Sequence, residues 1–425
     1  MKGSSILSYT VIDQALELID NGEIEKGLSL LKENETKLGE EDLFQTAQIY
    51  QQLGMLEDAK VLFKNLLFQF PNESDLIISL AEVHIDLDEE DEAMGLLENI
   101  SEEDNVYVQS LLLLADLYQA QGLYEVSEQK LLAAKKIAPN EPIISLALGE
   151  VYLSQGDYKK AIPFYQTVLP HADELDFSLQ ERLAECYSAT GQFEEAMSYF
   201  DQALQKELKI DVLFQYGFTA FQAGYFKTSI EKLNQVKELD YEYSSLYLYL
   251  AKAYEHEGLL EDSLGVAKEG LAVNEYNKEL QVYGAKVAMK QQNVDEAEKL
   301  LREAIAIDPG YVEAALTLTK IFLQEERYEN VIDCLKELIN FGETDPQYEW
   351  DLAVAYQKTE RYSDALNHYR HAYTSFKDDS SFLYDYAHFL LEEGKREEAK
   401  PLFEKLIQLD PTNIELQDLY LNLQE

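Results

Sequence analysis

The residues of this sequence that most resemble a reactive or metal-binding set are histidines. His368 and His371 stand three residues apart in one helical stretch, and His388 lies in the next. Two imidazoles at this spacing share one face of a helix and hold zinc when further ligands converge on them. His388 is expected to project from a different face, and no Cys or third convergent His is available. We therefore predict structural or solvent-facing histidines and no metal site.

A second candidate is an acidic run whose spacing resembles a calcium-binding loop, formed by Asp86, Asp88, Glu90 and Asp91. The glycine and the closing glutamate that such a loop requires are missing, so a solvated acidic turn is the better interpretation. The sequence also contains no glycine-rich phosphate loop, no Ser-His-Asp arrangement and no HExxH motif. We predict no catalytic residues, no cofactor and no enzymatic activity.

The charge of the chain limits its partners. Of 425 residues, 81 are acidic and 35 are basic, which gives a formal net charge of −46. Such a chain repels phosphate backbones and anionic membranes, so we expect no nucleic-acid partner. Two interpretations of the charge stay open: attraction of a basic protein partner, or a solvated surface that keeps the protein soluble.

The first twenty residues contain one lysine and no long apolar run. They predict neither a signal peptide nor a membrane-inserted helix, and hence a cytoplasmic protein. The two cysteines, Cys186 and Cys334, lie in apolar helical stretches far apart in the chain. We expect both to be free thiols packed as small hydrophobic side chains.

The elements that position all these residues are set by an internal repeat. Segments such as QLGMLEDAKVLF (52–63), SQGDYKKAIPFY (154–165) and EEGKREEAKPLF (392–403) are variants of one turn followed by the start of a helix. Most repeats are 34 residues long, and the others have 32, 33 or 35 residues. The alignment predicts one array over residues 1–425, with twelve repeats that start at residues 8, 40, 74, 108, 142, 177, 210, 244, 278, 312, 346 and 380.

Small residues recur where two helices of a repeat must touch. The eighth residue is Gly or Ala in every repeat except the tenth, which has Thr319, and the twentieth is small in every repeat except the tenth, which has Val331. Small side chains allow helix axes to approach closely. Glycine ends the first helix in eight repeats, where a positive φ is expected, at residues 22, 54, 122, 156, 191, 224, 258 and 394.

This pattern resembles the tetratricopeptide repeat (TPR) family over residues 8–413. The resemblance implies an all-α fold, a right-handed TPR α-solenoid of about twelve helix-turn-helix repeats, with residues 412–425 as a C-terminal capping helix. The aromatic residue usual at the fourth place of the family is mostly replaced here by Leu, Ile or Gln. In repeat 10, Glu326 also replaces the usual turn glycine. We expect its two helices to sit farther apart, unless compensating substitutions restore the spacing.

In TPR arrays the first helices of successive repeats line a concave groove, so the resemblance implies that a partner binds their exposed faces. The fifth residue of nearly every repeat is apolar or aromatic, as in Phe214, Leu248, Trp350 and Tyr384. The ninth residue changes charge along the array, and further lysines follow one turn later. The ninth residue is acidic at Glu82, Asp116, Glu150 and Glu185 and basic at Lys252, Lys286 and Lys320. The lysines one turn later are Lys290 and Lys358.

These lysines have two interpretations. They could bind acidic side chains or a terminal carboxylate of a partner peptide. They could instead pair with the chain's own carboxylates, such as Glu255, Glu279 and Glu313, in surface ion pairs of little energy.

The favoured function is a scaffold or adaptor that binds a protein or peptide partner of unknown identity. The alternative is a regulatory sensor whose solenoid changes curvature on binding a peptide or small ligand. Small-angle scattering with and without ligand would distinguish the two. Self-assembly through the array ends is opposed by polar caps and by the charge, so a monomer is favoured.

Overall fold

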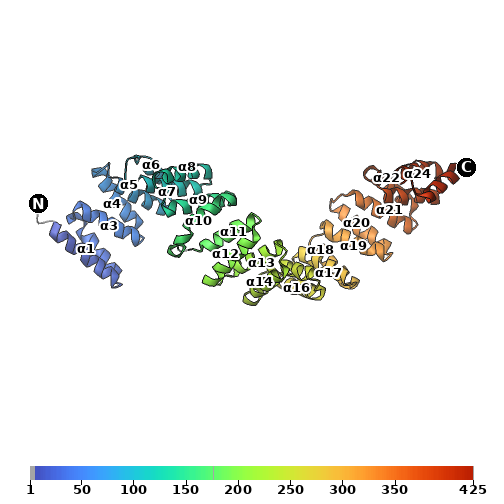
Figure 1. Cartoon of the computed structure of the whole chain (residues 1–425), viewed down its shortest axis with the longest axis horizontal. Helices are drawn as coiled ribbons and strands as arrows, with labels where there is room; N and C mark the ends of the chain where they lie inside the picture. The colour runs from blue at the N-terminus through green and yellow to red at the C-terminus, as the bar shows by residue number, and fades with distance from the viewer. Residues whose placement is uncertain (1–4, 176, 425) are drawn as a thin grey trace. The chain divides into compact units, whose positions relative to one another are not determined.

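The computed structural model describes residues 5–175 and 177–424, and over these ranges the chain is helical with short connections. The helices occur in pairs, each with a first and a second helix joined by a tight turn (Figure 1). The all-α solenoid fold expected from the sequence is thereby observed. The chain divides into two compact units, one ending at Lys206 and the other beginning at Glu207.

Six helix pairs make up the first unit. Its first helices are α1 (Ser5–Asp20), α3 (Glu40–Gln52), α5 (Ser74–Asp86), α7 (Tyr107–Ala120), α9 (Pro142–Ser154) and α11 (Leu179–Ala189). Its second helices are α2 (Ile24–Asn34), α4 (Leu56–Gln69), α6 (Glu90–Leu97), α8 (Tyr124–Ile137), α10 (Tyr158–Val168) and α12 (Phe193–Lys206). Short 3-10 turns follow α2 and α10, at Glu35–Lys37 and Leu169–Glu174.

Six pairs and one terminal helix make up the second unit. Its first helices are α13 (Ile210–Gln222), α15 (Ser245–His256), α17 (Lys278–Lys290), α19 (Val312–Gln324), α21 (Pro346–Lys358) and α23 (Ser380–Glu392). Its second helices are α14 (Phe226–Leu239), α16 (Leu260–Val273), α18 (Val294–Ile307), α20 (Tyr328–Asn340), α22 (Tyr362–Phe376) and α24 (Arg396–Leu409), and α25 (Ile414–Gln424) packs on α24.

The turn between the two helices of each repeat requires a left-handed backbone. All eight turn glycines have a positive φ, between 72° and 84°. In the four repeats that lack glycine, other residues adopt the same conformation with φ near 60°: Asp88, Gln292, Glu326 and Glu360. The backbone geometry of the turn is therefore kept even where the side chain makes it unfavourable.

Replacing Glu326 by glycine is expected to stabilise the second unit by about 0.5–1 kcal/mol. The left-handed conformation costs a residue with a Cβ atom about 1–2 kcal/mol, and the greater freedom of glycine in the unfolded chain offsets part of that gain. The neighbouring Glu325 has φ of −89°, so Glu325→Gly should instead destabilise. Urea unfolding followed by circular dichroism compares the two variants, and an unchanged or lower midpoint for Glu326→Gly would contradict the strain argument.

The small residues lie where the helices of a pair approach most closely. All the residues at the eighth and twentieth places are buried. A Cβ atom added at Gly27 would lie 2.8 Å from the carbonyl oxygen of Ala15, and the Ser263 hydroxyl donates to the carbonyl of Ala251 at 2.8 Å. Larger side chains at either place would force the two helices apart.

Repeat 10 keeps its irregular pair inside the core. Thr319 and Val331 are both fully buried, and the Thr319 hydroxyl donates to the carbonyl of Ala315 in its own helix at 2.8 Å. An open cleft of about 670 Å³ lies beside this pair, lined by Phe322 of α19, Cys334 of α20 and residues of α18. The wider spacing of α19 and α20 and the associated change of curvature, both expected from the sequence, stay predictions.

None of the helices over residues 5–175 and 177–424 is both long and apolar enough to span a membrane.

Candidate functional site

The first helices of the second unit form a layer in which side chains join neighbouring first helices at several places. The Tyr283 hydroxyl of α17 donates to Glu255 of α15, and the Trp350 indole of α21 donates to Asp385 of α23 at 3.1 Å. The Gln357 amide of α21 also donates to α23. We call the exposed side of this layer, which carries Lys252, Lys286, Lys290, Lys320 and Lys358, the lysine face.

Lys252 is held by aromatic rings. Its ammonium lies 5.7 Å from the ring centroid of Tyr249 and 5.8 Å from that of Tyr283. Within the ranges that the structure describes, no carboxylate lies within 4.0 Å of this ammonium. Cation–π contacts orient the charge but leave it free to meet an incoming anion.

Two other lysines are already paired with the chain's own carboxylates. Lys286 contacts Glu313 at 2.5 Å, and Lys290 contacts Glu255. Lys286 also lowers the pKa of Glu313, mainly through this hydrogen bond. Part of the lysine set therefore follows the ion-pair interpretation, and exposed pairs of this kind contribute little energy.

Lys320 and Lys358 are exposed, and over the described residues neither makes an ion pair. Each acts at longer range on one half-buried aspartate. Burial raises the pKa of Asp351 to about 6, and the charge of Lys320 partly opposes that rise. Burial likewise raises the pKa of Asp385, against the hydrogen bond from Trp350 and the charge of Lys358. These lysines thus lie beside carboxyl groups with a reduced tendency to ionise.

An aromatic cluster adjoins Lys252. Phe218 of α13 lies 4.7 Å from Tyr249 of α15 between ring centroids, and Phe214 packs on both rings. All three side chains are partly exposed. The sequence argument named Phe214 but missed Phe218, Tyr249 and Tyr283; Phe218 occupies the ninth place in repeat 7, where the charged residues were sought.

The remaining apolar candidates differ in exposure. Leu248 and Trp350 are partly buried, and Trp350 packs edge-on against Phe376 and Phe382. Tyr384 is exposed and stacks on His388. Trp350 is thus largely a packing residue, whereas Tyr384 is accessible to a partner.

The acidic candidates all lie on first helices of the first unit. Burial raises the pKa of Glu82, Asp116 and Glu185. Glu150 accepts the Tyr165 hydroxyl at 2.7 Å and the Arg182 guanidinium at 3.2 Å. Arg182 also lies 3.9 Å from Glu185 and lowers its pKa in part. A cation of this unit therefore already offsets part of the acidic row.

His388 does not join the other two histidines, as expected, but His368 and His371 share a carboxylate partner that was not expected. His388 lies apart from the other two, with its Nδ1 2.9 Å from the carbonyl oxygen of Tyr384 on its own helix. His368 and His371, however, both meet Glu349 of α21, with Nδ1 to Oε2 distances of 2.7 and 3.3 Å. Asp88 of the acidic run is the left-handed turn residue between α5 and α6.

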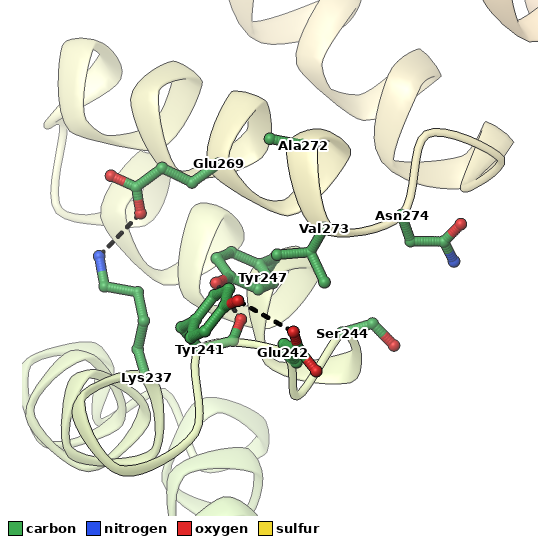
Figure 2. A pocket seen from close by; sticks show the side chains of 9 residues that line it. All are labelled: Lys237, Tyr241, Glu242, Ser244, Tyr247, Glu269, Ala272, Val273 and Asn274. Atoms are coloured by element: carbon green, nitrogen blue, oxygen red, sulfur yellow. Dashed lines mark hydrogen bonds and ion pairs between the residues drawn. The ribbon is translucent and has the colours of Figure 1, made fainter.

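A concavity of about 930 Å³ lies in the second unit where α14, α15 and α16 meet (Figure 2). Its charged rim is internally satisfied, because Lys237 pairs with Glu269 at 2.9 Å and the Tyr241 hydroxyl donates to Glu242. It brings together no reactive or metal-binding set.

Comparison with known proteins decides the family. Residues 119–172 match the family described as YpiA-like tetratricopeptide repeats, and residues 346–413 match its C-terminal repeats. A general tetratricopeptide repeat family matches residues 50–117, 152–212 and 288–349. The TPR repeat-containing protein YpiA of Bacillus subtilis (strain 168) is 46% identical over 98% of this chain and 99% of its own length. The chain belongs to the YpiA-like family of tetratricopeptide repeat proteins. The family expected from the turn and small-residue pattern is confirmed.

Other similar proteins are more distant. Anaphase-promoting complex subunit 7 of Dictyostelium discoideum is 30% identical over 26% of this chain and 20% of its own length. Among solved structures, a chain of the Cut9–Hcn1 hetero-tetramer of the anaphase-promoting complex is similar over 97% of this chain and 95% of its own length. The sequence identity is 12% and the TM-score is 0.35. YrrB, a TPR protein with an unusual peptide-binding site, is similar over 44% of this chain and 96% of its own length. The sequence identity is 16% and the TM-score is 0.38.

Proposed function

We propose that this protein is a non-enzymatic scaffold whose lysine face binds an acidic segment of a protein partner. The observation that carries the proposal is Lys252, a cation oriented by two tyrosine rings with no carboxylate of the described residues within 4.0 Å. A partner carboxylate is the natural complement of such a charge. Lys320 and Lys358 add two exposed cations to this face; over the described residues they make no ion pair, and they act at longer range on Asp351 and Asp385.

The aromatic cluster adds a second requirement on the partner. Phe214, Phe218 and Tyr249 offer partly exposed ring surface next to Lys252. Aromatic and apolar side chains of a partner would bury there, and such anchors usually supply most of the binding energy. The proposed ligand is therefore a peptide or helix that combines acidic residues with an aromatic or large aliphatic side chain.

A charge-reversal variant tests the proposal. Lys252→Glu, Lys320→Glu and Lys358→Glu, combined in the full chain, are expected to weaken binding of acidic-aromatic peptides by more than about tenfold, because each new carboxylate repels the ligand. Peptide display on the native chain would select the probe, and fluorescence anisotropy would measure its affinity. Binding by the native chain should weaken as salt is raised.

The matched control makes the same change at three exposed lysines of the second-helix side: Lys227, Lys299 and Lys377. It has the same net charge as the test variant, so retained affinity would separate a local site from an effect of total charge. Equal affinity of the test variant and the native chain would overturn the proposal. We further propose that the protein acts in the cytoplasm.

A further inference from the structure

Repeat 11 brings two imidazoles and a carboxylate to one point. His368 and His371 lie one turn apart on α22, and Glu349 lies at the start of α21. One ring nitrogen of each histidine and one carboxylate oxygen of Glu349 all lie within 4.8 Å of one another. Among the described residues this is the one such group that combines histidines with a carboxylate.

The geometry points to a site for a zinc-class divalent metal ion held by Glu349, His368 and His371. Tetrahedral zinc with bonds of about 2.0–2.1 Å keeps its donor atoms about 3.3 Å apart. The His371 Nδ1 to Glu349 Oε2 distance is 3.3 Å, and the corresponding His368 distance is 2.7 Å. A widening of about 0.6 Å at His368, within reach of side-chain rotation, would bring its distance to Glu349 to the same value.

The surrounding residues orient these ligands. The His368 ring stacks on Tyr356 with a centroid distance of 5.2 Å and an interplanar angle of 10°. The rings of His368 and His371 are nearly perpendicular, at 84°, yet both direct a nitrogen to the same oxygen of Glu349. Without a cation, that single oxygen has to satisfy two ring nitrogens; a bound cation would accept lone pairs from all three groups.

There is room for a fourth ligand. An open pocket of about 300 Å³ adjoins the site and is lined by Glu349, His371 and Asp345, among others. The His371 side chain is 69% exposed, so water has direct access. Three protein ligands with one open position are the usual arrangement of a zinc ion that can exchange its fourth ligand.

The ligand types select the metal class. Imidazole suits Zn²⁺, Cu²⁺ and Ni²⁺, whereas Mg²⁺ and Ca²⁺ require shells of oxygen. A bound ion would tie the first turn of α21 to the middle of α22 and stabilise the second unit by mass action. From the sequence we predict no metal here, because no third histidine or cysteine converges on His368 and His371; in the structure the third ligand is a carboxylate, Glu349.

Titration of the untagged, metal-free full chain with Zn²⁺ tests the site. Excess Mg²⁺ is included so that the many exposed carboxylates do not contribute. Calorimetry is expected to show one tight site, and Co²⁺ in its place should give the visible absorption of tetrahedral coordination. His371→Asn and Glu349→Gln should each weaken the affinity by more than about 100-fold, since loss of even an outer-shell partner commonly costs 10–100-fold.

His388→Asn is the matched control, because the polar contact of that histidine lies within α23 and does not involve Glu349. It should bind Zn²⁺ as the native chain does. Circular dichroism would confirm that each variant is folded, which is expected for the exposed His371. Absence of a tight site in the native chain, equal affinity in His371→Asn, or an equal loss in His388→Asn would each overturn the assignment.

Discussion

Gly149→Ala is expected to destabilise the first unit by about 1–3 kcal/mol. A Cβ atom at this position would lie 2.6 and 2.8 Å from two carbons of the Tyr165 ring. That ring cannot move away easily, because it is fully buried and its hydroxyl is fixed by Glu150 at 2.7 Å. The loss should outweigh the gain of about 1 kcal/mol that alanine brings to a helix. Urea unfolding and hydrogen exchange in α9 and α10 measure it.

Gly95→Ala is the matched control in the same unit. A Cβ atom there meets no atom within 4 Å, so only the helix-propensity gain is expected. A second test combines Gly149→Ala with Tyr165→Leu, whose shorter side chain removes the ring edge. The alanine should cost at least about 0.5 kcal/mol less in that background. Equal costs in both backgrounds would show that the contact with Tyr165 is not the cause.

Asp351→Asn is expected to stabilise the second unit by about 1–3 kcal/mol at pH 7.5, and by progressively less as the pH falls toward 4. Burial raises the pKa of this carboxyl from 3.8 in the unfolded chain to about 6. The folded chain therefore binds a proton between these values that the unfolded chain does not bind. The native aspartate costs stability fully above pH 6, and this cost disappears below about pH 4.

The difference in unfolding free energy between variant and native chain, measured from pH 4.5 to 7.5, isolates this one group. Asp333→Asn is the control, because Asp333 is an exposed residue within α20. A pH dependence shared by both variants would point to the loss of a carboxylate in general rather than to burial at Asp351. A constant difference for Asp351→Asn across the range would show that burial does not perturb the Asp351 carboxyl.

The fold could be predicted because the turn and the helix contacts leave direct marks in the residue types. Glycines such as Gly224 and Gly258 predict a left-handed turn, and small residues such as Ala251 predict a close approach of two helices. Gln292 and Glu360 leave no such mark. Their left-handed backbone follows from the packing of the helices on either side, which overrides the local preference of each residue.

The candidate site was less accessible to sequence reasoning. Glu255 and Glu313 were foreseen as possible partners of lysines, but which lysine each one meets depends on side-chain conformations across neighbouring repeats. Glu349 joins His368 and His371 only because two helices pack, and no spacing rule links residues 19 and 22 positions apart. Tyr283 could not be predicted as a contact of Lys252, because its ring lies on α17, the first helix of the next repeat.

The single tryptophan has a spectroscopic consequence. The sequence contains one tryptophan, Trp350, and 29 tyrosines. The indole N–H of Trp350 donates to Asp385, which lies near Lys358. Trp350 also directly follows Glu349 in the chain. Its emission would therefore respond locally, shifting in colour when an acidic peptide displaces water at Asp385 and losing intensity when Cu²⁺ or Co²⁺ occupies the neighbouring carboxylate. One natural fluorophore would thus distinguish the two proposed binding events without any label.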